Sequence, residues 1–165
     1  MSRCDQCARA SPLSTVTTAS LAALRRYSEA VKLSEAGAYP QAIALLDEAV
    51  QLDTAFAMAY RKLSALHFNS GDLRGMGQAC RSVVAHLDRL TEKEGYLALA
   101  QCGELLGRTR VEAMQALQSV LRLDPFESAA LNNLAYAYQD LDRFEEAGEL
   151  LERAVSNTVA VPRTT

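Results

Sequence analysis

The sequence contains no tryptophan, few other aromatic residues and no long run of apolar residues. Only 6 Tyr and 4 Phe are present among 165 residues, which argues against a stacking surface for single-stranded nucleic acid. No apolar run approaches the roughly 20 residues that a membrane-spanning helix needs. Residues 1–18 also lack the apolar centre of a secretion signal. We therefore expect no membrane association and a cytoplasmic location.

Charge of either sign is not in large excess. The net charge is −3 and the isoelectric point is near 5.4, so the basic face that nucleic-acid binding requires is not expected. The two histidines, His67 and His86, belong to no recognisable catalytic motif, and no HExxH, nucleophile elbow or glycine-rich phosphate loop is present. We expect neither enzyme activity nor a cofactor.

One stretch of the sequence recurs four times. Residues 37–53, GAYPQAIALLDEAVQLD, return in altered form from Gly71, Arg108 and Asp142. The residue at the middle of the stretch is Ala42, Met76, Ala113 and Ala147, at intervals of 34, 37 and 34. A nearly fixed period of this size is typical of stacked helical hairpins, in which each unit buries its apolar face against its neighbours.

Other columns of the repeat agree with this period. Four places after the middle residue stand Leu46, Cys80, Leu117 and Leu151, and three places further on stand Ala49, Val83, Val120 and Ala154. The spacing i, i+4, i+7 is one face of a helix, and a second periodic segment precedes it in every unit. Each unit is therefore predicted to be helix, turn, helix.

The repeat resembles the tetratricopeptide repeat, most closely in its fourth copy. Family hallmark places there hold Leu134, Ala135, Tyr138, Phe144, Ala147, Leu151 and Ala154. The first copy departs from the family at Glu29, and the third departs at Gln101 and Arg110. The resemblance implies an all-α, right-handed superhelical solenoid of about four helix-turn-helix repeats. It also implies a non-catalytic module for protein–protein interaction, with a protein or peptide as the partner.

The period sets the predicted boundaries. We expect an N-terminal tail at 1–18, a repeat domain at 19–156 and a C-terminal tail at 157–165. The predicted repeats cover 23–56, 57–90, 94–127 and 128–157. The excess of three residues in the period is predicted around AHLDRLTEKEGY, at the joint of the second and third repeats. We interpret it as a tolerated loop insertion, the alternative being an insertion that bends the array or widens its groove.

Helix ends can also be predicted. The first helix is expected at about 19–36, ended by Gly37, with Pro40 in the first turn of the next helix. Thr91 with Glu94 and Thr109 with Glu112 have the form of capping boxes, so helices are expected to start after each Thr.

Two segments carry a further resemblance. Residues 16–33 and 87–102 look like the corresponding segments of tetratricopeptide arrays in bacterial multidomain regulators. The resemblance implies a scaffold or regulatory component in a bacterium, without the signalling or DNA-binding domains that accompany such arrays.

First helices of such repeats line a concave surface, which is the usual binding face. The residues predicted to face this groove are Tyr27, Val31, Arg61, Lys62, Ala65, Asn69, Ala98, Cys102, Asn132, Asn133, Tyr136 and Asp140. Asn and Tyr can hydrogen-bond an extended peptide, and Arg61 with Lys62 could bind a carboxylate. A solvated face without a ligand is the simpler alternative for any single residue.

The last predicted helix suggests another function. No capping helix follows residues 144–157, so the side that carries Leu150 and Val155 has no evident cover. The alternative function is therefore a self-associating structural unit, a homodimer, that buries Leu150 and Val155.

Cys4 and Cys7 form a CxxC pair in the predicted tail. A structural zinc site needs two further ligands at suitable spacing, and Cys80 and Cys102 lie far along the chain on predicted helices. We interpret the pair as inert and predict no bound metal. Elemental analysis of purified protein should accordingly find well below one zinc per chain, and one equivalent or more would contradict this interpretation.

Overall fold

The computed structural model describes residues 18–160, and the side chains of residues 18–156. All regular structure among these residues is helical, which confirms the predicted all-α class. The helices are α2 (Leu21–Glu35), α3 (Tyr39–Leu52), α4 (Ala57–Asn69), α5 (Leu73–Ala85), η1 (Leu87–Arg89), α6 (Glu92–Cys102), η2 (Gly103–Leu106), α7 (Arg110–Leu123), α8 (Ser128–Gln139) and α9 (Phe144–Ala160). The chain divides into two compact units, of which the first ends at Thr91 and the second begins at Glu92.

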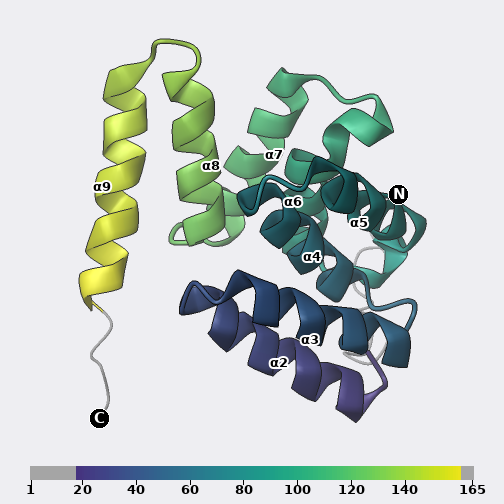
Figure 1. The fold of residues 1–165 in the computed structure, drawn as a ribbon. Coiled ribbons are helices and arrows are strands. Elements are labelled where there is room, and N and C mark those ends of the chain that lie inside the picture. Colours follow the sequence, from purple (N-terminus) through teal and green to yellow (C-terminus); the bar gives the residue numbers. More distant parts are fainter. Residues whose placement is uncertain (1–17, 161–165) are drawn as a thin grey trace, which may run out of the picture. The chain divides into compact units, whose positions relative to one another are not determined.

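Each unit consists of two helical hairpins (Figure 1). In the first unit α2 pairs with α3 and α4 with α5, and α4 also packs against α3. Its core combines small residues such as Ala30 and Ala42 with Leu46 and Phe56, all fully buried. The ring of Tyr27 lies 5.2 Å from that of Phe56, so an aromatic pair links α2 to the segment that leads into α4.

The second unit repeats this arrangement. Here α6 pairs with α7 and α8 with α9, while α8 packs against α7. Its core is centred on Leu117, Val120, Leu131 and Leu134, with Leu150 contributed by α9. Small residues at the helix contacts, such as Ala135 and Ala147, let the paired helices approach closely. The four predicted helix-turn-helix units are therefore present.

All four hairpins turn through the same hydrogen-bonded motif. After the first helix the backbone N–H of Ala38 donates to the carbonyl of Leu33 at 2.9 Å, and that of Gly37 donates to Ser34 at 3.1 Å. This pair of bonds is the Schellman motif, which requires a left-handed residue between the helices. The left-handed residues of the four turns are Gly37, Gly71, Gly107 and Asp142, with φ of 77°, 75°, 66° and 57°.

The extra three residues lie inside the third hairpin, so their predicted position at the preceding joint is wrong. The buried small residues of the first helices are Ala30, Ser64, Ala98 and Ala135, at intervals of 34, 34 and 37. The middle residues of the second helices have intervals of 34, 37 and 34. The excess therefore falls between Ala98 and Ala113, where α6 ends early and the chain continues as η2.

Several predicted helix ends agree with the structure. Pro40 lies in the first turn of α3, and α6 begins directly after Thr91. Thr109 and Glu112 form the predicted capping box, in which each side chain accepts the backbone N–H of the other residue.

The predicted boundaries of both tails are corrected by the structure. Cys4 and Cys7 lie outside the described residues. Thr18 belongs to the folded part, because its side chain is buried and its hydroxyl donates to the carboxylate of Asp53. At the other end α9 continues to Ala160, so residues 157–160 are helical and are not a separate tail.

A substitution in the turn between α8 and α9 should increase the stability of the fold. Asp142 adopts a left-handed conformation that costs an L-residue roughly 1–2 kcal/mol, against a greater chain entropy loss for Gly of roughly 0.5–1 kcal/mol. We expect Asp142→Gly to raise the free energy of unfolding by about 0.5 kcal/mol, measured by urea unfolding followed by circular dichroism. The matched variant Gly71→Ala meets no atom within 4 Å, so only its backbone strain should matter, and it should lose about 1 kcal/mol. Equal stability of all three proteins would contradict the assignment.

Candidate functional site

One face of α8 carries a row of exposed side chains that can form hydrogen bonds. Asn132, Tyr136 and Asp140 follow one another at i, i+4, i+8, with Asn133 beside them, and all four are exposed. The Tyr136 side chain is 67% exposed, although its neighbours Leu134 and Ala135 are buried in the core. The predicted groove residues of the fourth repeat therefore form one accessible surface, which we call the α8 face.

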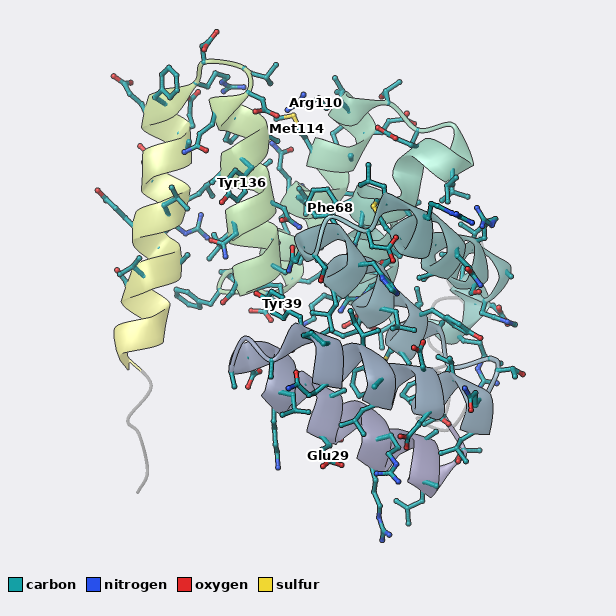
Figure 2. The ribbon with its side chains drawn as sticks, in the orientation of Figure 1. Glu29, Tyr39, Phe68, Arg110, Met114 and Tyr136 are labelled. Carbon is teal, nitrogen blue, oxygen red and sulfur yellow. The ribbon has the colours of Figure 1, made fainter. Side chains whose placement is uncertain are left out.

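A salt bridge joins the C-terminal end of the α8 face to α7. A guanidinium nitrogen of Arg110, the first residue of α7, donates to the carboxylate of Asp140. Figure 2 labels Arg110 and Met114 on α7 and Tyr136 on α8. Arg110 is one of the residues at which the third copy departs from the family, and the structure gives it a partner. The ion pair holds Asp140 at the end of the row, so a ligand there would meet a partly neutralised carboxylate.

The first unit places its predicted groove residues on α2 and α4. Asn69 is exposed, whereas Tyr27, Val31, Arg61, Lys62 and Ala65 are half-buried. Phe68, labelled in Figure 2, is 59% exposed beside Asn69 and was not among the predicted residues. Its spacing of three from Ala65 was the available signal, because i and i+3 share a helical face.

For two residues, the prediction that they face the groove is wrong. Ala98 and Cys102 are buried, so their side chains are not available to a ligand. The physical reason is the position of the extra residues: with the insertion inside the third hairpin, Ala98 is the small core residue equivalent to Ser64 and Ala135.

The second unit also has a hollow lined by three of its helices. A cavity of about 390 Å³ is open to solvent between α7 and α9 and is lined by Gln118, Leu121, Arg122, Leu134, Tyr138, Glu146, Glu149, Leu150 and Arg153. The guanidinium of Arg143 lies 4.5 Å from the ring centre of Tyr138 and donates to Glu146, and this bond lowers the pKa of Glu146. The sequence offered no signal for this cavity, because its lining comes from three helices.

Charged groups elsewhere have structural partners. The ammonium of Lys93 lies 3.0 Å from a carboxylate oxygen of Asp124 and 2.9 Å from one of Glu127. These hydrogen bonds raise the pKa of Lys93 and lower that of Asp124. His67 contacts Asp72 at 2.9 Å, and the pKa of Asp72 is lowered chiefly by the backbone N–H of Gly75 and further by His67. Both networks join a helix to a neighbouring turn.

The described residues contain neither a cluster of metal ligands nor a membrane-spanning helix. Within residues 18–160, no three His, Cys, Asp or Glu side chains come together as metal ligands. In the same range, every helix is too short or too polar to cross a bilayer.

Comparison with known proteins identifies one repeat. Residues 128–157 match the family model of the tetratricopeptide repeat, so the resemblance stated for this stretch is confirmed. No curated protein matches the chain.

Solved structures similar to this chain include two of MamA and one of YrrB. A MamA crystal structure has 20% identity and a TM-score of 0.46 over 81% of this chain and 77% of that chain. MamA from Desulfovibrio magneticus RS-1 has 19% identity and a TM-score of 0.45, covering 85% and 77%. YrrB, described as a TPR protein with an unusual peptide-binding site, has 21% identity and a TM-score of 0.34, covering 81% and 85%.

The capping box beside the α8 face gives a prediction for acid stability. The pKa of Glu112 is lowered from 4.5 to about 2, first by the backbone N–H of Thr109 and then by Arg108. A lowered folded-state pKa stabilises the fold above pH 4.5, and this stabilisation is lost as the pH falls towards 2. We expect Glu112→Gln to be less stable than wild type at neutral pH, with the difference shrinking between these values in urea unfolding experiments.

The exposed Glu35→Gln, which lies outside the capping box, is the matched control and should show a smaller difference at neutral pH. A stability difference for Glu112→Gln that does not change with pH would contradict the role of the carboxylate.

Proposed function

We propose that this chain, which contains a tetratricopeptide repeat, is a non-catalytic module that binds a peptide or partner protein on the faces of its first helices. The observation that carries the proposal is the α8 face, where Tyr136 is 67% exposed between two exposed asparagines and Asp140. An exposed Tyr offers a large apolar surface and a hydroxyl with little loss of side-chain entropy on binding. Asn132 and Asn133 can each donate to and accept from an extended peptide backbone.

The first unit has a set of residues of its own that suits a peptide. Arg61, Lys62 and Asn69 on α4, with Phe68 beside them, combine positive charge, an amide and an exposed aromatic ring. This composition suits a peptide that carries a carboxylate and an apolar side chain. Tyr27 and Val31 on α2 and Ala65 on α4 would form the less polar part of the same surface.

We further propose a scaffold or regulatory role in the cytoplasm of a bacterium. This part of the proposal is supported by the resemblance of residues 16–33 and 87–102 to segments of bacterial regulator arrays.

The test compares two variants of the second unit, each altered at exposed positions. Wild type, Asn133→Ala/Tyr136→Ala and the matched control Phe144→Ser are immobilised and exposed to a bacterial lysate, after circular dichroism has shown equal helicity. A partner of the α8 face should be retained by wild type and by Phe144→Ser. The α8 variant should retain about tenfold less, since loss of an interface tyrosine commonly costs more than 1 kcal/mol.

Equal retention of every partner by all three proteins would contradict binding at the α8 face. If Phe144→Ser loses partners and the α8 variant loses none, binding at the α8 face is also contradicted, and the partners belong to α9.

A further inference from the structure

The outer side of α9 carries an apolar stripe that no described residue covers. Phe144, Leu151 and Val155 lie at i, i+7, i+11, which is one face of the helix, with Gly148 between them. Their side chains are 64%, 36% and 63% exposed. Leu150, which the sequence placed on the uncovered side with Val155, is instead buried in the core, so that expectation is corrected.

The place of Leu151 is covered by a helix in the first hairpin of each unit. Leu46 of α3 and Leu117 of α7 occupy the place of Leu151 and are buried. In the first unit α4 packs against α3, and in the second α8 packs against α7. The stripe on α9 therefore has the shape and composition of a surface on which a helix packs.

The hairpin that carries this stripe is strongly acidic. Residues 128–157 contain six Asp and Glu and two Arg, a net charge of −4 against −3 for the whole chain. Both arginines have contacts within the second unit: Arg143 donates to Glu146, and Arg153 donates to the carbonyl of Pro125 at 2.8 Å. Glu145 and Glu152 stand exposed along one side of the stripe, so the surface is complementary to positive charge.

We propose that the outer face of α9 docks a basic amphipathic helix of another protein. Its apolar stripe would pack on Phe144, Leu151 and Val155, and its Lys or Arg residues would pair with Glu145 and Glu152. This surface lies on a different helix from the α8 face, so the two proposals stand or fall separately.

A second copy of this chain fits the surface less well. Two copies of α9 would place the acidic rows of both molecules at the same contact, and like charges at an interface are unfavourable. The outer face of α2 offers Arg25, Glu29 and Lys32, all exposed, where α4 has the apolar Ala59, Leu63 and Leu66. Figure 2 shows Glu29 on the outer side of α2. The exposed apolar residues of α2 beside these charges, Leu21 and Leu24, lie within its first turn, so a second copy offers a shorter apolar stripe than the one on α9.

The experiment uses a designed peptide and fluorescence anisotropy. The probe is a labelled peptide of about 20 residues, long enough to be helical, with leucines at i, i+3, i+4, i+7 and lysines beside them. A scrambled peptide of the same composition and a version with glutamates in place of lysines are the controls. Wild type should bind the lysine-flanked helix at least tenfold more tightly than either control, and more weakly when sodium chloride rises from about 50 to about 300 mM.

Protein variants locate the binding. Phe144→Ser/Val155→Ser should lower the affinity about tenfold, since it removes two exposed apolar contacts without touching the core. Glu145→Gln/Glu152→Gln should lower it severalfold and reduce its dependence on salt. Leu24→Ser on α2 and Asn133→Ala/Tyr136→Ala on α8 should leave it unchanged.

Three results would overturn the proposal. The first is equal affinity for the helical and scrambled peptides. The second is loss of binding in the α8 variant, which would place the peptide on the α8 face. The third is sedimentation of the protein alone as a dimer that Phe144→Ser/Val155→Ser converts to a monomer, which would make a second copy the occupant.

Discussion

The first and last hairpins depend on the close contact of two helices at small residues. Ala30 on α2 and Ala42 on α3 are fully buried where those helices pair, and Ala135 and Ala147 have the same place on α8 and α9. A hairpin built this way cannot bury both of its sides, because its apolar residues point to the partner helix and to the next hairpin. Each compact unit is therefore a pair of like hairpins, and within the unit each hairpin stabilises the other.

Because the two helices of a hairpin must lie close together, the way each helix ends matters for the fold as much as its apolar face does. Paired helices must reverse within a few residues, and the four turns do so with one hydrogen-bond pattern and a left-handed residue. The third hairpin reaches Gly107 only after the 3-10 helix η2, which accommodates three extra residues without disturbing the core contacts of α7. The repeat thus accommodates a longer turn while its core contacts are kept.

The same constraint separates surfaces with different chemistry. The exposed side chains of α8 are free of packing requirements, and Asn132, Asn133 and Tyr136 stand at these positions. Asp140, at the C-terminal end of the helix, pairs with Arg110 of α7. The face of α9 that would receive a further hairpin keeps the apolar residues of a packing surface and adds carboxylates beside them. The α8 face is suited to hydrogen-bonding an extended chain, and the outer face of α9 is suited to packing against a helix.

Periodicity determined the helical class, the number of hairpins and the exposed residues of the α8 face, and capping motifs determined the helix starts after Thr91 and Thr109. These features depend on local sequence, since helix caps and the spacing of apolar residues act within one or two turns. Only the tertiary structure decided where the three extra residues of the third repeat lie. The apolar spacing within each helix of a hairpin stays the same when the turn between the two helices becomes longer, so this spacing does not locate the insertion. The burial of Ala98, Cys102 and Leu150 was also decided by the tertiary structure. Periodicity shows that a helix has an apolar face, but the position of the partner helix determines which residues at the edge of that face are covered.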